Sequence, residues 1–260
     1  MRQRYHIKFP PADSQALGQN EVSFFLVEDG DEKRFRFHDY DEIYSRPGLY
    51  EQIFYDRLKC SSPSKVGEIL KKSMDANGWN LTESRVLDLG AGNGIMGEVL
   101  KKHGVARLVG VDIIPEAKDA VIRDRPDLYD DYYVADFINL DDDVREELVE
   151  WQFDCLTCVA ALGFDDIPAP AFLQALRLIR SDGGWVAFNI KESFLDHRDT
   201  SGFSNFIREL IFSEYLDLHH LERYRHRLSM EGLPLYYFAL VAQKAADIPA
   251  DFFERHGVQA

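Results

Sequence analysis

Four glycines interrupt residues 86–97, which read VLDLGAGNGIMG. An apolar run that breaks into glycines predicts a strand, a tight turn and the start of a helix, because so sharp a turn visits positive φ. A glycine also lacks a Cβ, so a ligand can approach its backbone closely. One acid, Asp88, stands inside the apolar run. This combination is typical of a site that binds a nucleoside-bearing ligand.

Two further acidic residues are expected at the ends of neighbouring strands. Residues 107–111 predict a strand that leads into Asp112, and residues 131–135 predict another that leads into Asp136 and Phe137. In open α/β sheets, ligands bind in the crevice outside the carboxyl ends of the strands. The two acids and the glycine run therefore indicate one binding site at that edge of a sheet.

Strands and helices alternate along residues 86–190. The predicted helices are 95–103, 115–124, 144–151 and 170–180, and the predicted strands are 86–89, 107–111, 131–135, 153–161 and 184–190. Such alternation implies right-handed crossovers and a parallel sheet with helices on both faces. Two last strands, 221–230 and 235–244, are joined by four residues and must be antiparallel. We therefore expect a doubly wound α/β fold with a mostly parallel seven-stranded sheet and an antiparallel C-terminal strand.

An extension precedes this core. Residues 1 to about 20 predict an irregular lead-in, and 22–27 with 33–37 predict a hairpin. In the tyrosine-rich segment that follows, Tyr50 and Tyr55 are candidates for a lid over the acceptor, although aromatic side chains equally anchor an extension to a domain. A helix is predicted from Ser62 to a stop at Asn77. The domain boundaries predicted in this way are an N-terminal cap (1–61), a core domain (62–246) and a C-terminal tail (247–260).

Composition limits the partners. The chain has 260 residues, 45% of them hydrophobic, which is enough for one globular unit. Thirty basic and 45 acidic side chains give a formal charge of −15, which repels phosphate backbones and anionic lipid heads. Neither a signal peptide nor an apolar run of membrane-spanning length is visible. We expect a cytoplasmic protein that binds neither nucleic acid nor membrane, and whose terminal strands could pair two copies into a homodimer.

The three cysteines predict no disulfide framework. Cys155 and Cys158 lie on one predicted strand, where a spacing of three puts the two sulfurs on opposite faces. Core packing is therefore favoured over redox or metal chemistry, since a zinc site needs four ligands. His219 and His220 are adjacent, and neither has a spaced partner, so no metal is expected.

Taken together, these segments resemble the class I S-adenosylmethionine-dependent methyltransferases. Residues 86–94 are similar to the family's first motif, and residues 108–112, LVGVD, are similar to its second. The similarity continues at 136–137, at 153–154 and in the turn at 178–184, so that it covers about residues 62–244. The antiparallel terminal hairpin also belongs to the family's sheet. The resemblance implies S-adenosylmethionine (SAM) as cofactor and methyl transfer as activity.

The resemblance also implies a set of cofactor-binding residues. The acid equivalent to Asp88 and the carbonyls of the glycine turn would lie near the methionine ammonium, Asp112 would accept the ribose hydroxyls, and Asp136 the adenine amino hydrogens. The full set is Asp88, Gly90, Ala91, Gly92, Asn93, Gly94, Asp112, Ile113, Asp136, Phe137 and Ala160. Two alternatives stay open, because Asp88 could instead orient the loop and Asp136 could instead cap a helix.

A nicotinamide-dependent dehydrogenase is the rival interpretation, because residues 92–97 also satisfy G-x-G-x-x-G and Asp112 lies at the expected distance. Three features favour the methyltransferase. The first two glycines of that pattern come two residues late after the strand, an acid stands inside the strand, and no second catalytic domain follows residue 200.

Methyl transfer from a sulfonium is an in-line displacement, in which a general base helps when the acceptor is a hydroxyl, an amine or a carbon acid. Base candidates are expected in the loops after the fourth and fifth strands of the core. His197 and Glu192 are the candidate bases there, Phe164 is a candidate acceptor contact, and Asp165 and Asp166 are expected to cap the next helix. We expect a small-molecule oxygen or nitrogen acceptor. A protein-directed enzyme and a non-catalytic SAM-binding module are the alternatives.

Overall fold

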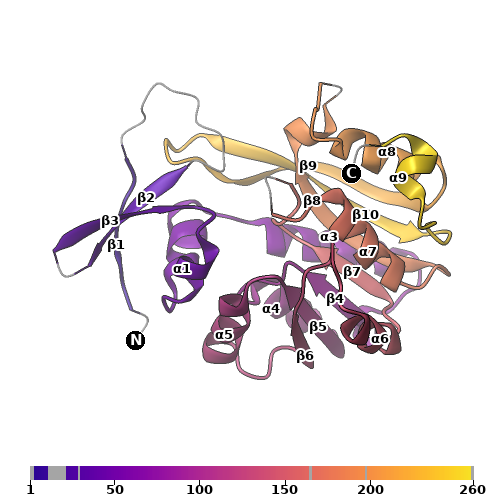
Figure 1. The fold of residues 1–260 in the computed structure, drawn as a ribbon, viewed down its shortest axis with the longest axis horizontal. Helices are drawn as coiled ribbons and strands as arrows, with labels where there is room; N and C mark the ends of the chain where they lie inside the picture. Colours follow the sequence, from indigo (N-terminus) through magenta and orange to yellow (C-terminus); the bar gives the residue numbers. More distant parts are fainter. Residues whose placement is uncertain (1–2, 11–21, 29, 164–165, 197, 259–260) are drawn as a thin grey trace.

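The central sheet consists of seven strands, which are β4 (Arg85–Leu89), β5 (Arg107–Asp112), β6 (Asp131–Val134), β7 (Cys155–Cys158), β8 (Gly184–Lys191), β9 (Leu216–Leu228) and β10 (Pro234–Lys244). The computed structural model describes residues 3–10, 22–28, 30–163, 166–196 and 198–258. The strand order is β6-β5-β4-β7-β8-β10-β9 (Figure 1). β10 runs antiparallel to β8 and β9, and the other neighbouring pairs are parallel. The predicted α/β fold with an antiparallel C-terminal strand is confirmed.

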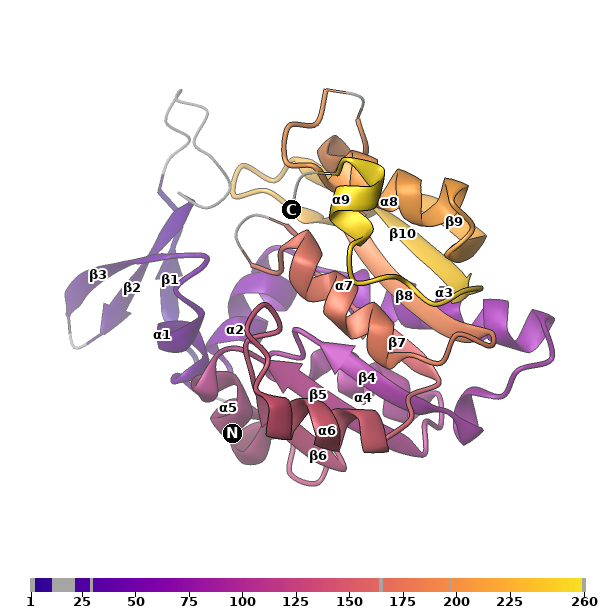
Figure 2. The same cartoon turned by 45° about the vertical axis from the view of Figure 1, so that its right-hand side comes forward.

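Helices cover both faces of this sheet (Figure 1 and Figure 2). Those of the core domain are α3 (Ser62–Ala76), α4 (Ile95–Lys102), α5 (Pro115–Asp124), α6 (Asp142–Glu150), α7 (Ala169–Leu178) and α8 (Phe203–Phe212). α3 and α4 share one buried cluster with the sheet, and α6, α7 and α8 share another. α3 illustrates the cause. A proline stands in its first turn, and Val66, Ile69, Leu70 and Met74 form one buried apolar stripe.

The strands are buried on both sides, as expected for parallel strands covered by helices. In β8 every residue except Lys191 is buried. The two cysteines of β7 are both fully buried, and they belong to different clusters. Cys155 packs with α3 and α4, whereas Cys158 packs with the helices of the opposite face. Burial raises the pKa of both thiols, so neither is a reactive thiolate.

A second, three-stranded antiparallel sheet lies in the cap. The cap elements are β1 (His6–Lys8), β2 (Ser23–Glu28), β3 (Asp31–Arg36), α1 (Tyr40–Tyr44), α2 (Leu49–Glu51) and the π-helix η2 (Gln52–Arg57). They enclose a separate apolar core that includes Phe24, Leu26 and Ile53. The predicted hairpin is confirmed. The prediction of an irregular lead-in was wrong for β1, because Ile7 is buried against β2 while its two strand neighbours stay exposed.

Several contacts join the cap to the core domain, and two of them lie at opposite sides. The N–H of Leu228 donates to the carbonyl of Leu58 at 2.7 Å, so the segment after η2 runs beside the end of β9. At the other side, Nη2 of Arg125, just after α5, donates to Oε1 of Glu51 in α2 at 2.9 Å. Both of these side chains are buried. Figure 1 shows the resulting arrangement, with α1 lying next to α5.

The segment after β10 folds back onto the core domain. It contains α9 (Phe252–His256), which the sequence did not predict, since residues 247–260 read as a tail. Phe252 is fully buried, with its ring against those of Phe206 and Tyr215. Two 3₁₀ helices, η3 (Leu81–Glu83) and η4 (Glu192–Leu195), complete the elements of the described residues. In the described part of the chain, no helix combines the length and the apolarity that a membrane crossing requires.

Candidate functional site

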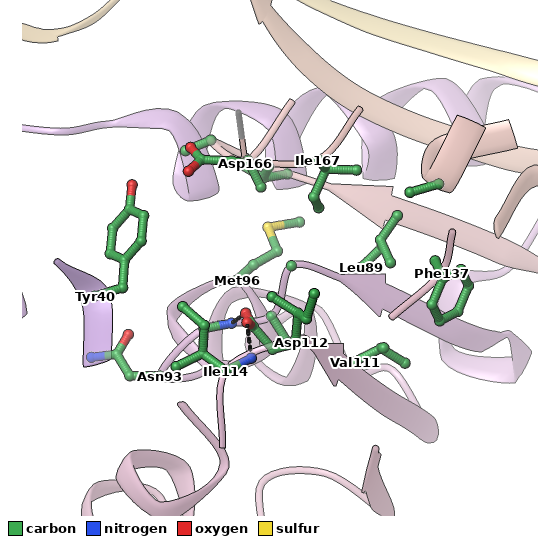
Figure 3. Close-up of a pocket in the computed structure, with 18 of the residues that line it drawn as sticks. Tyr40, Leu89, Asn93, Met96, Val111, Asp112, Ile114, Phe137, Asp166 and Ile167 are labelled. Atoms are coloured by element: carbon green, nitrogen blue, oxygen red, sulfur yellow. Dashed lines mark hydrogen bonds between the residues drawn. The ribbon is translucent and has the colours of Figure 1, made fainter. Parts of the chain in front are cut away.

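A cavity of about 160 Å³ lies where the carboxyl ends of β4, β5 and β7 face the cap. We call it the main pocket. Figure 3 shows Tyr40 and Asp166 at one end of it and Phe137 at the other. The sequence-predicted residues that line it are Tyr50, Tyr55, Gly90, Ala91, Gly92, Asn93, Asp112, Ile113, Asp136, Phe137 and Ala160. Asp88 and Gly94 are not part of its lining.

The glycine turn after β4 passes closely between the cap and β5. Gly92 has a φ of +53°, and a Cβ at this position would lie 2.5 Å from the hydroxyl oxygen of Tyr44. The N–H groups of Gly90 and Ala91 both donate to the carbonyl of Val111, at 2.8 and 3.0 Å. Glycine adopts this left-handed backbone without strain and leaves room for the tyrosine. The backbone of the turn therefore forms the pocket wall directly.

Asp112 ends β5 and points into the main pocket (Figure 3). Its Oδ2 accepts a hydrogen bond from the N–H of Gly92 at 2.8 Å, and its Oδ1 accepts one from the N–H of Ile114 at 3.1 Å. Burial raises the pKa of this carboxyl, and the backbone N–H groups of Ile114 and Gly92 act in the opposite direction. A carboxylate oxygen can accept more than one hydrogen bond. Asp112 can therefore hold the turn and accept from a vicinal diol together.

Asp136 and Phe137 follow β6 and line the other end of the pocket. Oδ2 of Asp136 accepts from the side-chain amide of Asn139 at 2.9 Å, and Oδ1 accepts from the N–H of Ile138 at 2.8 Å. The hydrogen bond from Asn139 has the larger effect and that from Ile138 the smaller, and both hold the pKa of Asp136 below its ordinary value. Phe137 is buried. This end of the pocket thus offers a charged acceptor beside an apolar ring.

Asp88 lies behind the pocket wall, and its side chain is 1% exposed. Its Oδ1 accepts from the hydroxyl of Thr157 at 2.7 Å, and its Oδ2 accepts from the hydroxyl of Tyr129 at 2.8 Å. Burial raises the pKa of Asp88 to about 6, although both hydrogen bonds act in the opposite direction. Asp88 is therefore not part of the pocket lining, and its two hydrogen bonds connect β4 to β7 and to the segment before β6.

This raised pKa predicts a pH dependence of stability. The folded state binds the Asp88 proton up to about pH 6, whereas the unfolded chain loses it near pH 4. The free energy of unfolding therefore falls as the pH rises through this window, by about 3 kcal/mol if the other groups are unchanged. We expect Asp88→Asn to lose this decrease, so its stability relative to the wild type should rise between pH 4 and pH 7. Urea unfolding at intervals of one pH unit measures the difference. Asp182→Asn, at a fully exposed side chain, should show none.

Four tyrosines of the cap, Tyr40, Tyr44, Tyr50 and Tyr55, line the main pocket. The rings of Tyr40 and Tyr44 stack at a centroid distance of 5.8 Å, and those of Tyr44 and Tyr50 lie 5.2 Å apart. Burial raises the pKa of all four hydroxyls. They are therefore neutral near pH 7 and can donate hydrogen bonds, but they are not bases. Their rings shield the pocket from water.

Glu192, one of the two candidate bases, is turned away from the main pocket. In η4 it forms a bidentate ion pair with Arg223, in which the Nε–Oε1 distance is 2.7 Å and the Nη2–Oε2 distance is 2.9 Å. The Arg223 hydrogen bond holds the pKa of Glu192 below its ordinary value, which makes this carboxylate a weaker base. His197, the other candidate, and Phe164 lie outside the described residues.

His38 and Asp166 form a pair that sequence reasoning missed. Nδ1 of His38, just after β3, lies 3.0 Å from Oδ1 of Asp166, just before α7. Asp166 was predicted to cap α7, and that prediction was wrong, because Pro168 is the N-cap residue of this helix. Asp165, for which the same was predicted, lies outside the described residues. The two residues are 128 positions apart. No sequence motif links residues so far apart, because His38 reaches the core domain only through the packing of the cap.

Ala160 occupies an unusual backbone conformation beside the pocket. Its φ is +61°, a region that residues with a Cβ rarely adopt. Its N–H donates to Oδ1 of Asn189 on β8 at 2.6 Å, which holds the loop after β7 in this form. Such strain collects at functional sites. Among the described residues, no group of three or more side chains of metal-binding type comes together.

Comparison with known proteins agrees with this geometry. The sequence matches a family described as a methyltransferase domain over residues 59–232. No curated protein matches the chain. The N-methyltransferase NodS from Bradyrhizobium japonicum, solved with S-adenosylhomocysteine, is similar in fold at a TM-score of 0.55 and 14% identity, covering 81% of this chain and 98% of that one. A proposed RNA methyltransferase from Pyrococcus horikoshii is similar at a TM-score of 0.52 and 14% identity, covering 72% and 87%.

The family match spans more than half of the chain and decides between the two interpretations that the glycine run allowed. The strand order and the antiparallel β10 agree with it. The chain belongs to the class I methyltransferases, enzymes whose methyl donor is S-adenosylmethionine.

Proposed function

We propose that this protein transfers a methyl group from SAM to an oxygen or nitrogen of a small molecule. The main pocket fits the cofactor by the chemistry of its lining. A Cβ-free turn at Gly92 lets a ligand approach the backbone, and Asp112 offers two acceptor oxygens at the end of β5. Asp136 and Phe137 offer an acceptor and an apolar ring at the far end. These are the groups that a ligand with an ammonium, a diol and an adenine requires.

Each residue then has a defined task. We assign the ribose hydroxyls to Asp112, the adenine to Asp136 and Phe137, and the methionine part to the backbone around Gly90 and Gly92. When bound, the cofactor supplies an electrophilic methyl group on a sulfonium. The chain has to orient the acceptor for in-line attack and exclude water from the pocket.

The tyrosine wall that the cap places over the glycine turn is the observation that carries the small-molecule assignment. Tyr44 is buried directly over the glycine turn, and Tyr40 and Tyr50 complete the wall on that side. This tyrosine wall narrows the approach to the glycine turn, which favours a small acceptor over a folded protein or an RNA helix. The formal charge of −15 also disfavours a nucleic-acid acceptor.

A radiolabelled transfer assay tests this function. Purified protein is incubated with tritiated SAM and a cell extract that has been separated into small molecules, protein and nucleic acid. We expect label in the small-molecule fraction. Label confined to protein or nucleic acid would contradict the acceptor class, and absence of transfer to any fraction, with intact SAM binding, would favour a non-catalytic SAM-binding module.

A further inference from the structure

A smaller cavity of about 40 Å³ adjoins the main pocket. We call it the side cavity. Tyr40, Tyr50, Ala160 and Asp166 line both cavities, so the two spaces meet at the end of the main pocket opposite Phe137. In Figure 3, Tyr40 and Asp166 mark this end of the main pocket and Phe137 marks the opposite end. The lining that belongs to the side cavity alone comes mostly from the cap and the terminal hairpin, with Leu162 from the loop after β7, and includes Phe37, His38, Cys60, His226, Arg227 and Tyr237.

Arg227 brings a buried positive charge to this cavity. Its side chain is 5% exposed, and its Nη1 donates to the carbonyl of Leu228 at 3.0 Å. The guanidinium carbon lies 5.6 Å from the centre of the Phe37 ring. Within the described ranges, no carboxylate forms an ion pair with Arg227, although the other buried arginine, Arg125, has two such partners. A buried cation without a counter-ion is costly, and an anionic ligand would remove that cost.

The neighbours of Arg227 do not neutralise it. His226 is buried, and burial together with the Arg227 charge lowers its pKa well below the ordinary value, so this ring is neutral. Its Nδ1 lies 2.6 Å from the hydroxyl of Ser62, which in turn lies 2.6 Å from the hydroxyl of Tyr224. Asn189 joins the same network and also holds Ala160. These hydrogen bonds are between neutral side chains, so none of them compensates the charge of the arginine.

The carboxylate that does line the side cavity, Asp166, contacts His38. Because this bond places the Nδ1 proton of His38 toward Asp166, the other ring nitrogen, Nε2, is left as the acceptor. Their side chains are 16% and 22% exposed. The pair therefore presents an oriented imidazole in the lining of the side cavity, beside Asp166, which lines both cavities.

We propose that the side cavity binds the methyl acceptor through an anionic group, with Arg227 holding a carboxylate or a phosphate and His38 accepting the proton. This inference rests on the proposed function. In the reaction, the acceptor oxygen or nitrogen forms a bond to the methyl carbon as the carbon–sulfur bond breaks. The acceptor's O–H or N–H proton passes to Nε2 of His38, and the sulfonium becomes a neutral thioether. Asp166 is a positioning residue that stabilises the imidazolium.

Binding of small probes tests the anion site without any turnover. Dissociation constants of benzoate, phenyl phosphate and neutral benzamide are measured by ligand-observed NMR on the full chain loaded with S-adenosylhomocysteine. We expect at least one anion to bind ten-fold or more tightly than benzamide, and the better of the two identifies the class. Arg227→Gln should abolish that preference. Arg225→Gln is the matched control, two residues along β9 at an exposed position, and should retain it.

Equal binding of all three probes by the wild type would overturn the anion site, and so would a preference that survives in Arg227→Gln. If Arg227→Gln does not fold, the comparison of the three probes on the wild type decides the question by itself. Calorimetric titration of the same samples with S-adenosylhomocysteine distinguishes failure of the proposed function from failure of the anion site. If the wild type does not bind S-adenosylhomocysteine, the proposed function is contradicted, whereas the anion site is not.

His38 is tested by substitution and rescue. In the transfer assay, His38→Ala should lose activity by 100-fold or more, as for other general bases, and should keep its affinity for S-adenosylhomocysteine. Added imidazole should restore part of the rate. Asp166→Asn should lower kcat with a smaller change in KM, and imidazole should rescue it less. The control is His220→Ala, on the exposed edge of β9. A His38→Ala rate within two-fold of the wild type, or a loss that imidazole does not restore, would contradict the role.

Discussion

Asp112→Asn should bind S-adenosylhomocysteine about 100-fold more weakly than the wild type. Hydrogen bonds to a charged acceptor contribute about 1.5–3 kcal/mol each, and a loss of about 3 kcal/mol corresponds to roughly 100-fold in affinity. In the variant, the amide N–H₂ of the asparagine faces one of two backbone donors, the N–H group of Gly92 or that of Ile114. Two donors cannot bond to each other, so one of these hydrogen bonds is lost. The change therefore removes a ligand acceptor and loosens the glycine turn. Isothermal titration calorimetry measures the effect.

Asp141→Asn is the matched control for this variant. Asp141 is exposed, and its carboxylate likewise accepts from a backbone N–H, that of Asp143 at 3.0 Å, but it caps α6 away from the pocket. Its affinity for S-adenosylhomocysteine should equal that of the wild type. If Asp112→Asn bound within three-fold of the wild type, the ribose assignment would be wrong.

Glu51→Gln should lower the free energy of unfolding by at most about 3–5 kcal/mol, which is the cost of leaving a buried charge with no partner, because Arg125 would keep only the more exposed Glu98, at 3.2 Å, as a charged partner. The partner is Arg125, and the two side chains are 6% and 8% exposed. Arg125 also donates from Nη1 to the carbonyl of Asn93 at 2.9 Å, so the same arginine connects the cap to the glycine turn. We therefore expect weaker cofactor binding together with lower stability.

Urea unfolding and calorimetry on one preparation measure both effects of Glu51→Gln. Glu42→Gln is the control, because Glu42 pairs with Arg46 on the outer side of the cap and is 44% exposed. Such a pair contributes at most about 1 kcal/mol, so its removal should change neither quantity much. A Glu51→Gln protein as stable as the control would show that the buried ion pair does not hold the cap.

Local patterns predicted the core sheet well, and tertiary contacts explain the misses. The glycine run, the proline at the start of α3 and the apolar strands are all short-range signals, and the elements built on them lie within a few residues of the predicted bounds. β1 has three residues, too few for its alternation to be recognised. α9 has five, and its formation depends on Phe252 entering an existing aromatic cluster. Nothing in the local sequence shows that such a cluster is present.

The same distinction applies to the site. The cofactor end could be predicted because Asp112, Asp136 and the glycine turn each follow directly on a strand of one parallel sheet. The acceptor end could not, because His38, Asp166 and Arg227 come from the cap, a loop of the core and the terminal hairpin. Arg227 is one of three arginines in residues 223–227, RYRHR, and residue types alone do not separate an exposed edge strand from an anion contact. Burial distinguishes Arg227 from its exposed neighbour Arg225, and burial depends on where the cap sits.

A crystal structure of the complex with S-adenosylhomocysteine tests the central claim most directly. We predict that the ribose hydroxyls lie within hydrogen-bonding distance of the Asp112 carboxylate, the adenine lies beside Phe137, and the sulfur lies toward Tyr40 and Asp166, where the side cavity opens. Binding of the ligand outside the main pocket, or in it with the adenine at the Tyr40 end, would contradict this assignment.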